Sequence, residues 1–170
     1  MKTEVSSFRL NKEILAKLKK EAENENISLN SLVNKILDTH VSWHSSAKKL
    51  GLIPIGPNVL TDLFKNLSEA EVKKLAKKQV PSISENVLLL RHEDTLEAFL
   101  DAAKDYFTVC GFPFSIQEKN GTIKITLRHA LGKKYSLYLE EIIRERIEQL
   151  TKERASVTST TNTITFSLKQ

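Results

Sequence analysis

The histidine, cysteine and carboxylate residues of this sequence do not form a pattern typical of a catalytic or metal site. His40 and His44 lie four residues apart and could bind one metal ion from a helix, but the sequence indicates no third ligand. We prefer the alternative that the two histidines lie at the surface or in an interface. The lone Cys110 excludes an intramolecular disulfide and a multi-cysteine zinc site. There is no phosphate-binding glycine loop, nucleophile elbow or pair of carboxylates in an apolar setting. We therefore expect no cofactor and no metal, and we do not expect an enzyme.

One other segment could bind an anion. The residues HALGKKYS, at positions 129–136, lead from a predicted strand into a helix, and a helix N-terminus attracts negative charge. We prefer the alternative that this segment is a tight turn, in which the His129 side chain caps the turn or packs against it.

Length, composition and charge limit the class of protein. The chain has 170 residues, of which 40% are hydrophobic, so it can bury a core of ordinary size. Its 26 Lys and Arg against 21 Asp and Glu give a net charge of +5, which permits a nucleic-acid partner without establishing one. No early apolar run resembles a signal peptide, and no stretch approaches the ~20 apolar residues that span a bilayer. We expect a soluble cytoplasmic protein.

The N-terminal segment Thr3–Leu10 reads as a β-strand, because apolar Phe8 and Leu10 alternate with polar residues. No second strand lies nearby in the sequence to take its backbone hydrogen bonds. Two copies of the chain could pair these strands antiparallel about a two-fold axis. The less favoured alternative adds this strand to a sheet formed later in the chain, which would leave the apolar stripes of the following helices exposed.

Two amphipathic helices follow the strand. Asn11 stands at an N-cap position, and apolar residues at helical spacing predict the first helix from Lys12 to about Glu25. Asn26 tolerates the left-handed conformation that ends a helix. Ser28 then caps a second helix, which is predicted to run to about Ala47.

This pattern resembles the ribbon-helix-helix family of DNA-binding proteins over residues 3 to about 45. The resemblance rests on Phe8-Arg9-Leu10 entering a helix at Asn11, and on Ile27-Ser28 opening the second helix. Many members have proline and glycine where this chain has Asn11 and Asn26, and the asparagines can do the same local work. The resemblance implies an intertwined dimer with a two-stranded β-ribbon covered by four helices.

The resemblance also implies which residues read DNA bases. In this family the ribbon lies in the major groove, which displays a distinct set of donors and acceptors for each base pair. If Phe8 and Leu10 point into the dimer core, Val5, Ser7 and Arg9 point outward. Arg9 would then pair with a guanine, Ser7 would donate or accept a hydrogen bond, and Val5 would touch a thymine methyl.

Phosphate contacts are implied in the same way. The amides around Ser28, Leu29 and Asn30, at the start of the second helix, would hold a phosphate, and Lys2 and Lys12 would add positive charge. The first 50 residues carry nine Lys and Arg against six Asp and Glu, so this region has a net charge of +3. That charge density exceeds the density in the rest of the chain, as the interpretation requires.

Residues 49–170 are predicted to form a second domain, distinct from a DNA-binding and dimerisation domain at residues 1–48. Glycines and prolines in LGLIPIGP, at positions 50–57, mark the boundary, and the apolar character of this segment predicts that it packs. Helices are expected at residues 58–66, from Ser68 through VKKLAKKQV, and at residues 95–109, while VLLLR at 87–91 fits a strand or, slightly better, a helix. The lysines of VKKLAKKQV form a basic face that could help to bind DNA, although a solvated surface is preferred.

The later part of this domain carries the clearest strand pattern. Asn120-Gly121 between two alternating runs is typical of a type I′ hairpin, and the register that pairs Ile116 with Ile125 puts the apolar residues on one face. A helix is predicted at residues 133–152, with Glu140 and Arg144 on its outer side, and strands at residues 155–158 and 163–168. The second domain is therefore expected to be α+β, with helices packed on an antiparallel sheet in the order helices, then ββαββ.

The ββαββ order looks somewhat like that of small ligand-binding domains of the vinyl-reductase-like and haem-nitric-oxide-binding type, without a matching haem signature. Nickel-responsive ribbon-helix-helix regulators also join a DNA-binding N-terminus to a larger domain, but their metal-site spacing is not visible here. The second domain could therefore bind a small ligand, whose identity the sequence does not indicate.

Together these features favour a sequence-specific transcriptional regulator that binds double-stranded DNA in the nucleoid as a homodimer or higher even oligomer. The alternative is a protein-interaction module, such as an antitoxin-like dimer whose C-terminal domain binds a partner protein. A folded domain of this length is unlike the short disordered tails of many antitoxins, which favours the regulator.

Overall fold

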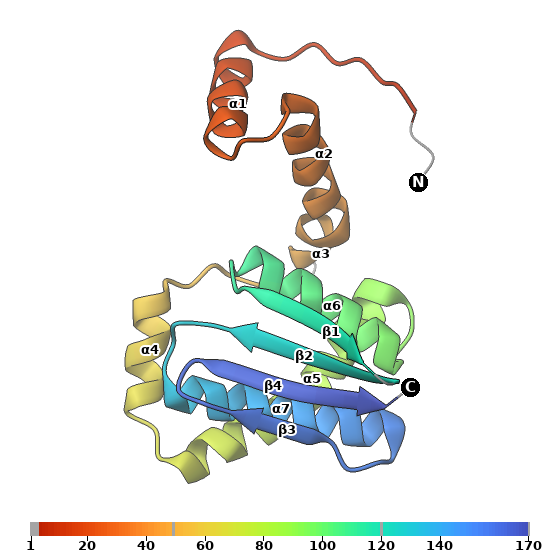
Figure 1. Cartoon of the computed structure of the whole chain (residues 1–170). Coiled ribbons are helices and arrows are strands. Elements are labelled where there is room, and N and C mark those ends of the chain that lie inside the picture. The colour runs from red at the N-terminus through yellow and green to blue at the C-terminus, as the bar shows by residue number, and fades with distance from the viewer. Residues whose placement is uncertain (1–3, 49, 120, 170) are drawn as a thin grey trace. The chain divides into compact units, whose positions relative to one another are not determined.

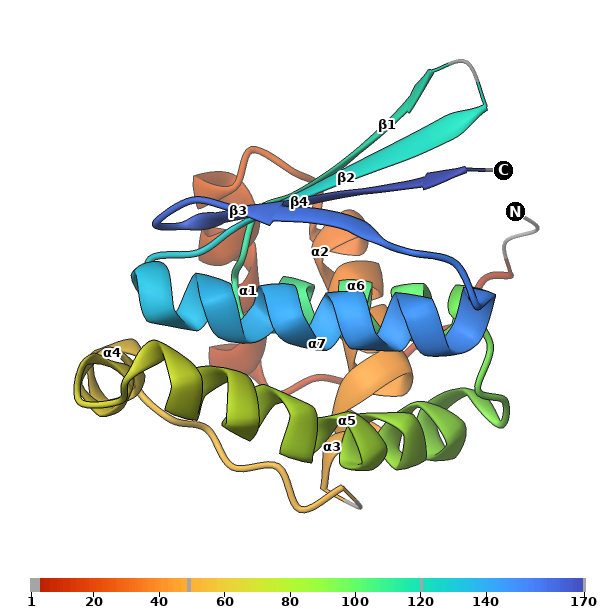
Figure 2. The same cartoon turned by 90° about the horizontal axis from the view of Figure 1, so that it is seen from below.

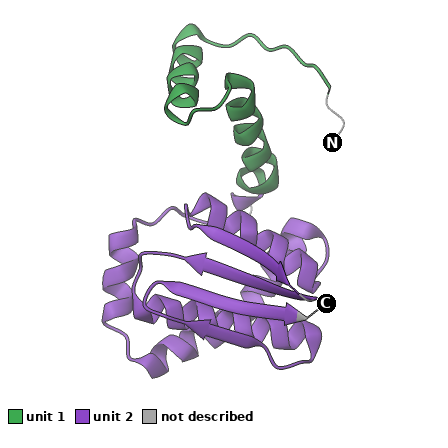
Figure 3. Cartoon of the chain, viewed as in Figure 1, with its two compact units in different colours: residues 1–45 green, residues 46–170 purple. Residues whose placement is uncertain are grey.

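The chain is an α+β protein with two compact units. A computed structural model describes residues 4–48, 50–119 and 121–169, and it divides the chain into Met1–Ser45 and Ser46–Gln170 (Figure 3). Helices occur in both units, and the antiparallel sheet belongs to the second. The predicted fold class is therefore confirmed at this level.

Most of the described part of the first unit is helical, and its last helix extends past the unit boundary at Ser45. Helix α1 (Lys12–Asn24) is followed by α2 (Leu29–Thr39), and a π-helical turn (His40–His44) continues α2 into α3 (Ser45–Ala47) (Figure 1). The second helix thus extends to Ala47 as predicted, with a wider turn that the periodicity did not indicate. Residues 4–11 are in neither helix nor strand in the single chain. The ribbon that Thr3–Leu10 would form with a second chain stays a prediction.

The second unit begins with three helices, of which the first starts at a proline without a side-chain cap and the other two start at side-chain caps. These helices are α4 (Pro57–Lys65), α5 (Glu69–Arg91) and α6 (Leu96–Val109). At the start of α5 the Ser68 hydroxyl accepts from the Glu71 amide at 3.2 Å, and the Glu71 carboxylate accepts from the Ser68 amide at 2.7 Å. This reciprocal capping box confirms the start predicted at Ser68.

Helix α5 passes through Pro81 and takes in the ambiguous VLLLR segment as helix. A proline inside a helix removes one amide donor and leaves a carbonyl without its partner. Pro81 lies on the exposed side of α5, where water can reach that carbonyl, while Val80 and Val87 are buried on the other side. Burial of this apolar side explains why the helix is continuous.

The segment before α4 does not pack as its composition predicts. Leu52, Ile53 and Ile55 are all exposed, so the expectation that this segment packs is wrong. By contrast, Phe64 of α4 is buried and packs edge-on against Tyr135 with ring centroids 5.2 Å apart.

The sheet has the strand order β1-β2-β4-β3, and all neighbouring strands are antiparallel. Its strands are β1 (Phe114–Lys119), β2 (Thr122–Arg128), β3 (Ser156–Ser159) and β4 (Thr163–Lys169). Ile116 pairs with Ile125, which confirms the predicted hairpin register. Within the described ranges the sheet takes no strand from residues 4–11, so the alternative that the N-terminal strand joins it is wrong.

Helices cover one face of this sheet in two layers (Figure 2). Helices α6 and α7 (Lys133–Thr151) lie against the sheet, and α5 lies on the side of α7 that faces away from it. Buried residues of β2 and β4, such as Leu127 and Ile164, point into the helical layer, whereas Thr126 and Thr165 alternate with them. The core of the second unit is therefore the space between the sheet and these helices.

Candidate nucleic-acid interface

The two asparagines that the sequence analysis singled out lie at the start of α1 and just after its end. Asn11 Oδ1 accepts from the Glu13 amide at 2.8 Å and caps α1. Asn26 has a φ of 54°, and the Ile27 amide after it donates to the Ala22 carbonyl at 3.0 Å. This is the left-handed helix stop that glycine usually provides, so both local substitutions work as predicted.

The start of α2 has the geometry that could hold a phosphate. Ser28 Oγ accepts from the Ser31 amide at 3.0 Å, which satisfies the third amide of the helix. The Leu29 and Asn30 amides belong to the first turn, where no intrahelical acceptor exists. Ser28 and Asn30 are exposed, so a bound anion could approach these amides and the positive end of the helix.

The predicted base-reading residues lie on the segment before α1. Val5, Ser7 and Arg9 are all exposed, and Lys12 is exposed at the first position of α1. Lys2 lies outside the described residues. Within the described ranges, no hydrogen bond or ion pair joins Val5, Ser7 or Arg9 to the start of α2. Among the described residues, the single chain therefore shows no direct polar contact between the two predicted contact sets.

The first unit exposes most of its large apolar side chains. Phe8 is 72% exposed and Val41 is 73% exposed. Four further members of this apolar surface are at least 40% exposed: Leu10, Ile14, Ile36 and Leu37. The buried apolar residues of the unit, among those described, are Ala22, Leu32 and Trp43. A core of this size leaves the helices with an apolar surface that the first unit itself does not cover.

Trp43 is a core residue that the sequence analysis did not identify. It is 7% exposed and lies in the π-helical turn. Its position seven residues after Ile36 continues the apolar stripe of α2, and this spacing could have indicated it. His40 and His44, in the same turn, are exposed, and the described residues contain no group of three metal-ligating side chains.

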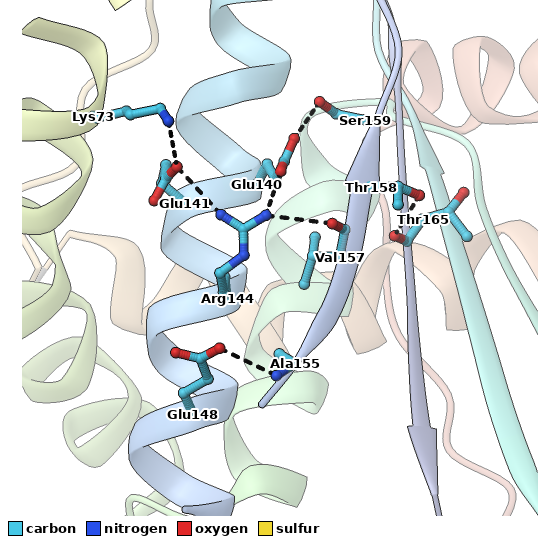
Figure 4. Close-up of polar contacts among 10 residues, drawn as sticks. All are labelled: Lys73, Glu140, Glu141, Arg144, Glu148, Ala155, Val157, Thr158, Ser159 and Thr165. Carbon is cyan, nitrogen blue, oxygen red and sulfur yellow. Dashed lines mark hydrogen bonds and ion pairs between the residues drawn. The ribbon is translucent and has the colours of Figure 1, made fainter. Parts of the chain in front are cut away.

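The charged groups of α5 and α7 form structural ion pairs. Arg144 donates to both Glu140 and Glu141 of α7, and to the Val157 carbonyl of β3 at 3.4 Å (Figure 4). Lys73 Nζ lies 3.4 Å from Glu141 Oε1. The predicted outer position of Glu140 and Arg144 is wrong, because β3 covers that side of α7.

The same contacts affect the basic face of α5. Lys77 Nζ also pairs with α7, at 3.2 Å from Glu145 Oε1. Lys73 and Lys77 are therefore partly neutralised by carboxylates. This arrangement favours a structural role for these two lysines over a DNA contact.

His129 is a buried turn residue. Its Nδ1 accepts from the Leu131 amide at 3.1 Å, and its Nε2 lies 2.8 Å from Ser136 Oγ. Ser136 Oγ donates to the Thr161 carbonyl at 3.0 Å, so Nε2 carries the ring proton and donates to Ser136. Burial lowers the pKa of His129 to about 4. A neutral imidazole held in this way caps the turn, which is the preferred alternative to an anion site.

Comparisons with known proteins do not assign the chain to a family. No protein-family model matches the sequence, and no curated protein matches it. Across the described residues, no helix combines the length and the apolar character needed to cross a membrane.

Proposed function

We propose that this protein is a sequence-specific DNA-binding transcriptional regulator that acts as a homodimer. Residues 3–10 of two chains would pair as an antiparallel β-ribbon and enter the major groove of double-stranded DNA. The observation that carries the proposal is the pattern of residues 7–10, in which polar Ser7 and Arg9 alternate with apolar Phe8 and Leu10, while Phe8 and Arg9 are both exposed in the single chain.

The exposed apolar surface of the first unit supports the dimer. Full burial of a side chain such as Phe or Leu stabilises a structure by roughly 1.5–3 kcal/mol. Pairing two copies would bury Phe8 and Leu10 with Ile14 and would give the backbone groups of the strand their partners. Dimer formation would therefore both bury the apolar surface and give the backbone of residues 4–10 its hydrogen-bond partners.

The polar residues would then be left for DNA. With the apolar side of the ribbon against the helices, Arg9 and Ser7 would face the base edges, where an arginine can donate two hydrogen bonds to guanine. The Leu29 and Asn30 amides at the start of α2 and the Lys12 ammonium would contact phosphates, which fix the register of the protein on the duplex.

An interaction module is the second candidate, and the same apolar surface favours it. A partner protein could cover Phe8, Ile36 and Val41 as well as a second copy could. The two candidates differ in the role of Arg9, because only the DNA-binding function requires its guanidinium at one position of a DNA site.

The test begins with selection of bound sites from a random duplex library by the full chain. Binding to the selected site is then titrated for Arg9→Ala, for Arg9→Lys and for Lys20→Ala, an exposed lysine of α1 that gives the same charge change. Arg9→Ala should lose about 1–3 kcal/mol of specific affinity per base contact and relax preference at one position of each half-site. Arg9→Lys should recover little of this loss, because an ammonium lacks the planar fork.

A separate variant tests the ribbon. Phe8→Ala should lower dimer stability first and DNA affinity only as a consequence, whereas Arg9→Ala should leave the dimer intact. Parent binding should also weaken steeply with salt, with a slope of roughly 0.9 per phosphate neutralised. If Arg9→Ala binds the selected site as tightly as the parent, the interaction module becomes the better account.

A further inference from the structure

The second unit contains a cavity of about 320 Å³, open to solvent over part of its surface, where α4 meets the other helices. Leu60, Leu63 and Phe64 of α4 form one wall, and Tyr135 and Tyr138 of α7 form another. Tyr106 of α6 and residues of α5 complete the lining. Its volume falls in the range of small-molecule sites, which are roughly 300–1,000 Å³.

The walls of this cavity are held in place by specific contacts. The Phe64 ring packs against Tyr135 at a centroid distance of 5.2 Å and against Tyr138 at 5.3 Å. Lys134 Nζ donates to the Lys65 carbonyl at 2.7 Å and also to the Leu67 carbonyl, so α7 holds the end of α4. The space is therefore bounded by fixed aromatic rings on one side and by the leucines of a short, anchored helix on the other.

The polar groups of the lining are neutral. They are the hydroxyls of Tyr106, Tyr135 and Tyr138 and the amide of Gln79, and no charged side chain lines the cavity within the described residues. Burial raises the pKa of Tyr106 to about 12, and burial followed by the neighbouring Tyr106 raises the pKa of Tyr135. Burial also raises the pKa of Tyr138. All three phenols therefore stay protonated at neutral pH and can donate hydrogen bonds.

We propose that this cavity binds a small uncharged aromatic molecule that carries one polar group, such as a two-ring phenol. Apolar cavities of about 150 Å³ bind benzene, so this larger space has room for two fused rings. The aromatic walls suit edge-to-face contacts with such rings. A charged ligand is disfavoured, because burying a charge without a partner of opposite charge is costly.

We assign the polar group of the ligand to Tyr138, which lines the cavity and whose ring centroid lies 5.3 Å from that of Phe64. Tyr106 and Tyr135 share a side-chain hydrogen bond with each other. Burial raises the pKa of Tyr138, and among the described residues no hydrogen bond joins its hydroxyl to Tyr106 or Tyr135. The Tyr138 hydroxyl therefore takes no part in the hydrogen bond between Tyr106 and Tyr135, and it can bond to a ligand.

The test uses the full chain and 2-naphthol as the probe, with binding followed by calorimetry and by ligand-observed NMR. Naphthalene is the matched probe without a hydroxyl, and 2-naphthoate is the charged one. We expect saturable binding of 2-naphthol with one site per chain, and binding of 2-naphthoate at least tenfold weaker. Absence of saturable binding by both neutral probes, or equal binding of 2-naphthoate, would overturn the proposal.

Two variants locate the site. Leu63→Trp should fill the cavity and weaken 2-naphthol binding at least tenfold, and Leu63 is 56% exposed, so the larger side chain is compatible with the fold. Leu89→Trp is the matched control, because Leu89 is a similarly exposed leucine of α5 outside the cavity lining, and its affinity should stay within twofold of the parent. Equal binding by the parent and Leu63→Trp would place the probe elsewhere and refute the assignment.

A third variant tests the polar contact. Tyr138→Phe removes only the hydroxyl and should weaken 2-naphthol binding about threefold to tenfold while leaving naphthalene binding unchanged. Loss of both probes to the same degree would show that the substitution disturbs the cavity and not a hydrogen bond, which would contradict the assignment to Tyr138. These measurements use no DNA, so they are independent of the proposed regulator function.

Discussion

Replacement of Asp94 should destabilise the second unit more than replacement of any surface acid. Arg146 of α7 is 2% exposed, and its guanidinium pairs with Asp94 in the turn between α5 and α6. The same guanidinium donates to Ser84 Oγ at 3.3 Å and to Gln149 Oε1 at 3.2 Å. Asp94 is the one carboxylate paired with this guanidinium among the described residues, so Asp94→Ala leaves a buried positive charge without a counter-charge.

The magnitude follows from the exposure of the pair. Removing one partner of a fully buried ion pair costs about 3–5 kcal/mol, because the remaining charge stays desolvated. The Asp94 side chain is 31% exposed, so water can approach the space that it leaves. We therefore expect Asp94→Ala to lower the free energy of unfolding of the second unit by about 2–4 kcal/mol.

The matched control is Asp62→Ala. Asp62 pairs with Lys65 at 3.3 Å, and both side chains are about 70% exposed. Exposed pairs of this kind stabilise proteins by about 0–1 kcal/mol. The two variants remove the same group and charge from the same unit and differ chiefly in the burial of the partner.

Intrinsic probes allow the two units to be followed separately. All three tyrosines lie in the second unit, and the single tryptophan, Trp43, lies in the first. In urea, the tyrosine near-ultraviolet transition of Asp94→Ala should move to lower denaturant by about 1–2 M, for an m-value of roughly 2 kcal/mol per molar urea. A shift no larger than that of Asp62→Ala would refute the view that Asp94 neutralises a buried charge.

Two further outcomes are expected. Burial lowers the pKa of His129 to about 4, below its ordinary value of 6.5, so between these pH values the unfolded chain binds more protons than the folded chain. The contribution of His129 to the free energy of unfolding should therefore be complete above pH 6.5. The free energy of unfolding should fall by about 1–3 kcal/mol as the pH drops toward 4. Urea titrations at pH 7 and pH 5 measure this, and an unchanged pH dependence in His129→Gln would contradict it. Deletion of residues 1–45 should convert a dimer at micromolar concentration into a monomer, as judged by sedimentation, and the truncated chain should keep its tyrosine unfolding transition in urea. A truncated chain that stays dimeric would argue against the ribbon.

Local chemistry explains why much of the fold was predictable. Asn11, Ser28 and Ser68 cap helices through hydrogen bonds to amides within three residues, so sequence spacing alone locates these starts. The β1-β2 register is equally local, because the Asn120-Gly121 sequence predicts a two-residue connection, which leaves one pairing that puts the apolar residues on one face.

Features that depend on distant parts of the chain were not predictable in this way. The ion pair between Asp94 and Arg146 joins residues 52 positions apart, and no local pattern indicates it. Glu140 and Arg144 have the spacing of an exposed helix pair, yet the return of β3 along α7 covers them. The cavity at α4 likewise depends on side chains from four helices, which sequence periodicity does not bring together.

The candidate DNA interface poses a different problem, because its decisive contacts would lie between two chains. Alternation predicts opposite environments for Phe8 and Arg9, one in a dimer core and one against DNA, but in the single chain both are exposed. Their side chains can differ in environment only when a second strand is paired and the helices cover one side of the ribbon. The proposed function therefore depends first on dimer formation. A dimer that depends on Phe8 but not on Arg9 must be demonstrated before a loss of DNA binding in Arg9→Ala can be assigned to base recognition.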